Sequence, residues 1–120
     1  MAYVTTIDAI NLTHNEYRAV LDRIGVEVNP AAGIYLHIAV PIEDGLRIVE
    51  IWDHKEGFEA FLKEHLAPAA MALGINREMR ITVEPLHNIF SPRLQELPGL
   101  VADAPGRRTG VHKSRRDTKD

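Results

Sequence analysis

Two short runs, "GIYLHIAV" at residues 33–40 and "LRIVEIW" at residues 46–52, constrain the fold more than any other feature of the chain. Both runs are rich in β-branched and aromatic residues, and only the residues of "PIEDG" lie between them. Such runs bounded by turn-forming residues are typical of β-strands. The sequence therefore predicts an antiparallel hairpin.

The register of this hairpin decides where Glu50, the single carboxylate of its two strands, lies. If Val40 faces Leu46, Glu50 lies among aliphatic side chains, which is costly without a partner. If Val40 faces Gly45, residues 41–44 form the loop, a length readily built around a type I turn. A one-residue slip moves every side chain to the other face. We therefore predict the pairing of Val40 with Gly45.

In this register neither face of the hairpin is polar enough to remain in water. The first face is almost purely aliphatic and holds Ile34, Leu36, Ile38, Val40, Val49 and Ile51. The second face is mixed and holds Tyr35, His37, Ala39, Leu46, Ile48, Glu50 and Trp52. Because a large exposed apolar patch marks an interaction site, we predict a homodimer in which two aliphatic faces pack together.

The remaining patterns up to Phe90 complete a βαββαβ order. We predict strands over residues 3–10, 33–40, 46–52 and 79–90, and helices over residues 13–25 and 53–74. This order is that of an α+β, ferredoxin-like antiparallel sheet with two helices on one face. Paired with a second copy, it forms a dimeric α+β barrel.

Capping signals mark the expected starts of both helices. Thr13 with Glu16, and Asp53 with Glu56, each have the spacing of a capping box. Pro68 is expected either to kink the second helix or to start a further turn.

Residues 91–120 differ in composition from residues 1–90. Up to Phe90 the chain has seven basic and thirteen acidic residues, whereas the remainder has seven basic and four acidic residues and no aromatic one. A segment with so few large apolar side chains cannot offset its ordering entropy. We predict one domain over residues 1–90 and a basic, flexible tail over residues 91–120. The tail could contact another protein, although a solvated end is favoured.

The mixed face of the hairpin predicts a small-molecule site beneath the second helix. In a regular helix His65 shares a face with Phe61 and Phe58, and that face would point toward the mixed face of the sheet. An apolar enclosure with a few convergent polar groups is the general form of such a site. The expected catalytic residues are His65, His37 and Glu50. The expected lining residues are Tyr35, Ile48, Trp52, Phe58, Phe61 and His87.

Several classes of function are excluded by what the sequence lacks. The chain has no cysteine, no apolar run long enough to span a membrane and no phosphate-binding glycine loop, and its basic residues form no aromatic-rich patch. Its histidines have no spacing typical of a metal site. We expect a cytoplasmic protein with no metal, no cofactor, no nucleic-acid partner and no membrane partner.

The segment "RIVEIWDHKEGFEAFLKEHL" resembles the strand-to-helix stretch of the antibiotic-biosynthesis-monooxygenase-like superfamily, the dimeric α+β barrel proteins. Glu50 and Trp52 match the glutamate and tryptophan that end a strand there, and Glu56 and Phe58 match the acidic helix start. The resemblance spans residues 1–90 in element order and implies a dimer with a cavity between helices and sheet.

The same segment departs from those monooxygenases at one position. Many of them have a histidine where this chain has Phe61, whereas His65 lies one turn later. His65 is similar in position to the acid/base histidine of the related stress-responsive barrels, which include plant polyketide cyclases. Those cyclases have a tyrosine near Phe61 and a second histidine near Leu46, and this chain has neither.

Two classes of function remain open. The first is an enzyme in which His65 acts as a general base on a phenolic, polyketide-like or β-keto substrate, with oxygenation, cyclisation or isomerisation as the outcome. Glu50, hydrogen-bonded to His37 or Tyr35, would be the orienting pair. The second is a binding or accessory protein that holds a small apolar or aromatic ligand without turnover.

Overall fold

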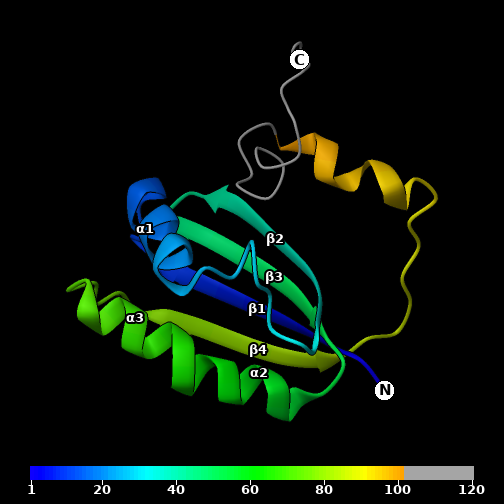
Figure 1. The fold of residues 1–120 in the computed structure, drawn as a ribbon, viewed down its shortest axis with the longest axis horizontal. Coiled ribbons are helices and arrows are strands. Elements are labelled where there is room, and N and C mark those ends of the chain that lie inside the picture. Colours follow the sequence, from blue (N-terminus) through cyan, green and yellow to red (C-terminus); the bar gives the residue numbers. More distant parts are fainter. Residues whose placement is uncertain (102–120) are drawn as a thin grey trace.

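The computed structural model describes residues 1–101 and consists of an antiparallel sheet with helices on one face (Figure 1). The strands are β1 (Tyr3–Ile10), β2 (Ile34–Ile42), β3 (Gly45–Trp52) and β4 (Met79–Pro85), in the spatial order β2-β3-β1-β4. The α+β, ferredoxin-like βαββαβ prediction is confirmed. In the described part of the chain, no helix combines the length and the hydrophobicity needed to cross a membrane.

Helix α1 (His14–Ile24) begins and ends as its sequence predicts. The Thr13 side chain accepts a hydrogen bond from the Glu16 backbone N–H, and the Glu16 side chain accepts one from the Thr13 N–H. These two bonds satisfy donors that have no partner inside the helix. Gly25 ends the helix with φ at 75°, in the left-handed region that favours glycine.

The N-cap of the second helix is His54, one residue later than the predicted N-cap at Asp53. Helix α2 (Lys55–Phe61) has His54 at its N-cap, and no side chain caps it. The predicted capping box of Asp53 with Glu56 is therefore wrong. Asp53 is held against the loop before β2, where its backbone N–H donates to the carbonyl of Gly33.

A π-helical turn interrupts this layer and changes which residues face the sheet. Helix α2 continues through η1 (Leu62–Leu66), a π-helix, into α3 (Ala67–Ala72). The Ala67 N–H donates to the Leu62 carbonyl, five residues earlier. Pro68 explains the wider turn, because it has no N–H and its ring clashes with a carbonyl four residues earlier. The extra residue moves Leu66 into the place that a regular helix would give to His65.

The hairpin of β2 and β3 sorts its side chains as predicted but with a shorter loop. Val40 pairs with Arg47, not with Gly45, so the loop contains only Glu43 and Asp44. The observed register differs from the predicted one by two residues, and a two-residue shift preserves the faces. The predicted separation of aliphatic and mixed faces is therefore correct, although the predicted pairing is wrong.

One irregularity changes the face of a single strand residue. The register shifts between Ile34 and Leu36, so that Ile34 pairs with Trp52 and packs against the interior cluster of Trp52 and Phe58. Ile34 was predicted on the aliphatic face. The bulge leaves Tyr35 at the strand edge, where 70% of it is exposed.

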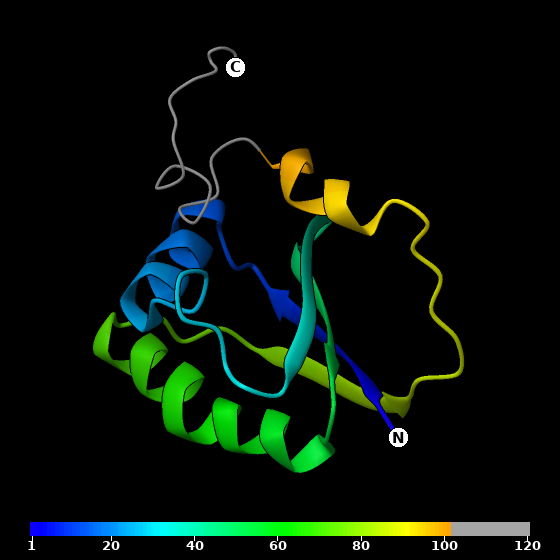
Figure 2. The same cartoon turned by 45° about the vertical axis from the view of Figure 1, so that its right-hand side comes forward.

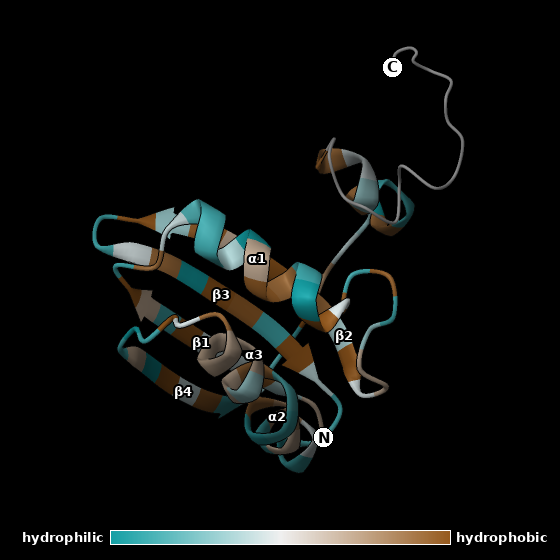
Figure 3. Cartoon of the chain, turned by 60° about the vertical axis from the view of Figure 1, so that its left-hand side comes forward, coloured by the Kyte–Doolittle hydropathy of each residue, from teal (hydrophilic) through white to brown (hydrophobic). Residues whose placement is uncertain are grey.

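All helices that flank the strands lie on one side of the sheet (Figure 2). Apolar bands run along the strands beneath these helices (Figure 3). The other side is a second apolar surface, which we call the open face. It consists of Val4 and Ile10 from β1, Leu36, Ile38, Val40 and Ile42 from β2, and Val49 and Ile51 from β3. Ile38 is 45% exposed and Val40 is 40% exposed.

Residues 86–101 extend from the end of β4 on the side of the open face (Figure 2). They include η2 (Leu94–Leu100), a 3-10 helix, so this part of the predicted tail has regular structure. Its large apolar side chains are exposed, with Phe90 at 84% and Leu100 at 77%. The remainder of the predicted tail, residues 102–120, lies outside the described residues.

Candidate functional site

A cavity of about 890 Å³ lies between the helices and the sheet. It exists because the helices cover the sheet incompletely. The tightly buried interior cluster contains Ile7, Trp52 and Phe58, whereas Met79 and Ile81 of β4 remain 42% and 38% exposed. A volume of this size is ample for a small organic molecule.

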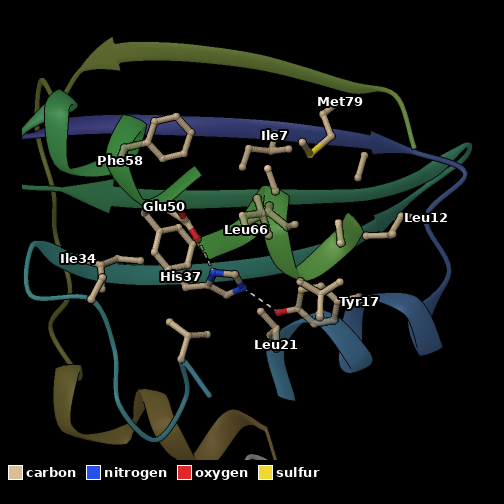
Figure 4. A pocket seen from close by; sticks show the side chains of 18 of the residues that line it. Ile7, Leu12, Tyr17, Leu21, Ile34, His37, Glu50, Phe58, Leu66 and Met79 are labelled. Atoms are coloured by element: carbon tan, nitrogen blue, oxygen red, sulfur yellow. Dashed lines mark hydrogen bonds and ion pairs between the residues drawn. The ribbon is translucent and has the colours of Figure 1, made fainter. Parts of the chain in front are cut away.

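Most of the cavity wall is apolar. Trp52 is 1% exposed and Phe58 is 2% exposed, and their rings meet edge to face with centroids 6.0 Å apart. Phe61 packs on the other side of Trp52 at 5.7 Å. Ile48 lines the floor from β3, and Leu66 lies on the wall formed by the second helical layer (Figure 4). A ligand here would contact aromatic rings and aliphatic side chains.

The polar atoms of the wall are concentrated in one hydrogen-bonded chain. His37 Nδ1 lies 2.7 Å from Glu50 Oε2, and His37 Nε2 lies 2.7 Å from the Tyr17 hydroxyl (Figure 4). Trp52 Nε1 donates to Glu50 Oε1 at 2.9 Å. The chain thus runs from α1 through β2 to β3, and it ties the helix to the sheet at this end of the cavity.

The partners limit where the hydrogens of this hydrogen-bonded chain can lie. The indole N–H of Trp52 can only donate, so Glu50 accepts on one oxygen, and its other oxygen lies at the distance of a hydrogen bond from His37 Nδ1. With His37 neutral and its hydrogen on Nδ1, Nε2 carries a lone pair and accepts the hydroxyl hydrogen of Tyr17. Every polar atom of His37 and both oxygens of Glu50 are engaged.

The Tyr17 hydroxyl has a higher pKa than an ordinary tyrosine. Burial, followed by the negative charge of Glu27, raises the pKa of Tyr17 to about 12. Its ring stacks on that of His37, with centroids 6.0 Å apart and planes 25° from parallel. Tyr17 therefore stays a neutral hydroxyl at ordinary pH and presents a single O–H to His37.

Two ion pairs hold the mouth of the cavity together. Arg77, from the loop before β4, makes a bidentate contact with Glu16 of α1 at 2.9 and 3.0 Å. Arg18 of α1 contacts Glu27, which also lines the cavity. The Arg77 guanidinium lowers the pKa of Glu16. These contacts fix α1 where it presents Tyr17.

His65 does not lie in the cavity, and its predicted position is wrong. It is exposed on the outer surface of the helical layer, in a shallow groove with Arg23 and Glu64. Its ring contacts the ring of Phe61 at 5.5 Å, but Phe61 alone of the two reaches the cavity. The π-helical turn is the physical reason, because it puts Leu66 on the inner face instead.

The other predicted site residues divide into three groups. His37 and Glu50 lie together at the polar end of the cavity, and Ile48, Trp52, Phe58 and Phe61 lie in its apolar wall. Tyr35 reaches only the rim, since the bulge turns it outward. His87 is exposed beyond the end of β4 and does not line the cavity, because the strand ends at Pro85.

Sequence reasoning missed Tyr17 as a site residue. From the sequence alone, Tyr17 belongs to an apolar stripe along the first helix, together with Val20 and Leu21. A signal was present, because Tyr17 is the one residue of that stripe with a hydroxyl at its tip.

Among residues 1–101, no group of three or more His, Cys, Asp or Glu side chains is placed to hold a metal ion. Among the titratable groups that line the cavity, His37 and Glu50 are bonded to each other, and Tyr17 is bonded to His37. The described site is therefore suited to proton transfer, with hydrogen bonding and apolar contacts to bind the ligand.

The sequence matches no family model and no curated protein. The fold, however, is similar to several solved structures. Rv0793 from Mycobacterium tuberculosis superposes with a TM-score of 0.53 at 15% identity, covering 77% of this chain and 99% of that one. SnoaB, a cofactor-independent oxygenase from Streptomyces nogalater, gives 0.51 at 15% identity, covering 74% and 94%.

A protein from Deinococcus radiodurans, provisionally assigned as an antibiotic biosynthesis monooxygenase, gives a TM-score of 0.54 at 18% identity, covering 76% of this chain and 97% of that one. The fold of this chain is therefore similar to that of these solved α+β proteins. At these identities the likeness concerns the fold alone.

Proposed function

We propose that this protein binds a small, mainly apolar ligand with one ionisable oxygen and acts on it by removing a proton. The observation that carries this proposal is the bonded chain of Tyr17, His37 and Glu50 at one end of an apolar cavity. A phenol, an enol or a β-keto compound has the matching chemistry.

The arrangement of His37 supports its role as the acid/base. Glu50 is 5% exposed and holds the Nδ1–H of His37, which orients the ring and leaves the lone pair of Nε2 toward α1. A proton received at Nε2 would make an imidazolium whose charge the Glu50 carboxylate balances. Positioned proton transfer of this kind contributes about 10²–10⁴-fold to a rate.

The apolar wall would complement this step. A ligand ring against Trp52 and Phe58 has little water around it, which strengthens the electrostatic attraction between its anion and the imidazolium. Oxygenation, cyclisation and isomerisation of such ligands can all begin with deprotonation. SnoaB, named a cofactor-independent oxygenase, has the same fold, and oxygenation is the outcome that we favour here.

Ligand binding can be tested through intrinsic fluorescence, because Trp52 is the single tryptophan of the chain and lies in the cavity wall. We would titrate the protein with 4-nitrophenol, which quenches tryptophan, and with nitrobenzene, which lacks the hydroxyl. The proposal expects saturable quenching by both and about tenfold tighter binding of 4-nitrophenol, the value of one hydrogen bond to a polar chain. Unsaturable quenching by both compounds would overturn the proposal.

We also propose that a second copy of the chain covers the open face. The helices α1, α2 and α3 all lie on the opposite side of the sheet, and the aliphatic side chains of this face extend over three strands. Ile38 and Val40 are 45% and 40% exposed, so covering them recovers part of the about 1.5–3 kcal/mol that full burial gives to such a side chain. Residues 86–101 extend on the same side, where Phe90 and Leu94 would meet the second copy.

A further inference from the structure

We infer that the Tyr17 hydroxyl, and not the His37 ring, is the group that exchanges a proton with the ligand. This inference rests on the proposed function, since it assigns the contact atom of the same site. It starts from the occupancy of the polar chain: both ring nitrogens of His37 and both oxygens of Glu50 already have partners.

Tyr17 is the last residue of this hydrogen-bonded chain. Its hydroxyl gives its hydrogen to His37 Nε2 at 2.7 Å, so its oxygen keeps lone pairs that no described residue uses. Tyr17 also lines the cavity, and Figure 4 shows it beside His37 at the cavity wall. A ligand hydroxyl can therefore donate to the Tyr17 oxygen without breaking any bond of the chain, whereas reaching His37 would require displacing Tyr17.

The proton moves in two coupled transfers. The O–H bond of the ligand breaks, its electron pair stays on the ligand oxygen, and the proton forms a new O–H bond on Tyr17. At the same time the original Tyr17 proton passes to His37 Nε2, and Glu50 balances the charge of the imidazolium. The products are a ligand anion, a neutral tyrosine and a protonated histidine, so atoms and charge balance without an oxidant.

The environment of Tyr17 favours a coupled transfer over a free tyrosinate. Burial and the charge of Glu27 disfavour the phenolate, so Tyr17 gives up its proton only as it receives another. The stacking of its ring on His37 keeps the donor and acceptor atoms aligned during the exchange. Tyr17 is thus assigned as a catalytic residue, and His37 becomes the acceptor behind it.

The test uses 4-nitrophenol as both ligand and proton donor, because its phenolate absorbs visible light and Trp52 quenching reports binding independently. With wild-type protein we expect the bound probe to be more ionised than the free probe at the same pH. Tyr17→Phe is expected to bind the probe but to lower its ionisation constant by about tenfold. Tyr3→Phe is the matched control, since Tyr3 lies outside the cavity wall, and it should behave as wild type.

The outcomes separate the two proposals. Absence of Trp52 quenching in the wild type overturns the proposed function itself. Quenching without excess ionisation, or equal ionisation in Tyr17→Phe and wild type, overturns the relay while leaving ligand binding intact. A second readout needs no variant: nitrogen NMR of His37 should show Nε2 gaining a proton when 4-nitrophenol saturates the wild-type protein, and an unchanged Nε2 signal would also overturn the relay.

Discussion

The two faces of the sheet are built from alternate residues of the same strands, yet they differ in how they treat polar groups. On the helix-covered face, Glu50 is buried and fully bonded to His37 and Trp52. On the open face, Arg47 and Asp8 form an exposed pair at the hairpin end, the other side chains of β2 and β3 are aliphatic, and β1 and β4 add the polar residues Thr6, Arg80, Thr82 and Glu84. One face thus holds a polar chain inside an apolar enclosure, and the other resembles half of an interface.

The comparison shows how the alternation of side chains along a strand can place a proposed binding site on one face of a sheet and a proposed docking surface on the other. A buried carboxylate is tolerated only where partners satisfy it, so Glu50 requires the face on which His37 and Trp52 bond to it. On the part of the open face formed by β2 and β3, the side chains other than Arg47 are aliphatic and need no such partners. The predictions below test whether the two faces have these distinct roles.

The largest expected effect is on the open face. Ile38→Asp places a carboxylate at the centre of an aliphatic surface, and a two-fold dimer would bury two copies of it. We expect dimer affinity to fall about a thousandfold, or about 4 kcal/mol, when sedimentation velocity is used to measure it. Ala60→Asp, an exposed residue of α2, is the charge-matched control. A wild-type protein that sediments as a monomer would contradict the dimer.

A second variant tests whether the helix-covered face truly encloses empty volume. Ala70 of α3 lines the cavity, and Ala70→Phe would fill part of it. We expect at least tenfold weaker 4-nitrophenol binding while the melting temperature is unchanged or higher, since the ring buries apolar surface in existing space. In a fully packed core the same change would cost about 1–3 kcal/mol. Ala60→Phe serves as the surface control.

A smaller effect is expected at alkaline pH. Because the folded protein raises the pKa of Tyr17 from 10.0 to about 12, it holds that proton more tightly than the unfolded chain does. The resulting stabilisation is complete below pH 10 and is lost as the pH rises toward 12. The expected loss is about 1 kcal/mol, less than the full shift implies, because solvent partly reaches the ring. Urea unfolding of wild type and Tyr17→Phe across this range should show the loss in wild type only.

The smallest effect is expected at His65. The side chain is exposed, and its described ring contact is with Phe61 on the outer side of the cavity wall. His65→Gln should therefore change the free energy of unfolding by less than about 0.5 kcal/mol and leave 4-nitrophenol binding unchanged. A tenfold loss of 4-nitrophenol binding in His65→Gln would show that His65 belongs to the site. For comparison, His37→Gln is expected to disturb both the binding and the ionisation of 4-nitrophenol.

The sequence was informative where a pattern depended on the alternation of side chains along a strand or on the capping residues of a helix. The faces of β2 and β3 could be predicted because alternation is insensitive to a two-residue shift of the loop. The loop length could not, since two-residue and four-residue turns both suit this hairpin. The cap at Thr13 and the stop at Gly25 were readable because each depends on neighbouring residues alone.

The site was harder to predict because it depends on small deviations from regular geometry. The pairing of His37 with Glu50 follows from the observed register, whereas the predicted register would have placed Tyr35 opposite Glu50. The outward position of His65 depends on one π-helical turn, which the sequence marks only through Pro68. Tyr17 was overlooked because its distance from His37 is set by how α1 packs, and no local pattern encodes that packing.

The most direct test of the account is a crystal structure of the protein with 4-nitrophenol bound. We expect the ring between the aromatic wall and α1, with its oxygen about 2.7 Å from the Tyr17 oxygen and the Tyr17–His37–Glu50 chain intact. A ligand that leaves the cavity empty, or that binds with its hydroxyl away from Tyr17, would contradict the account.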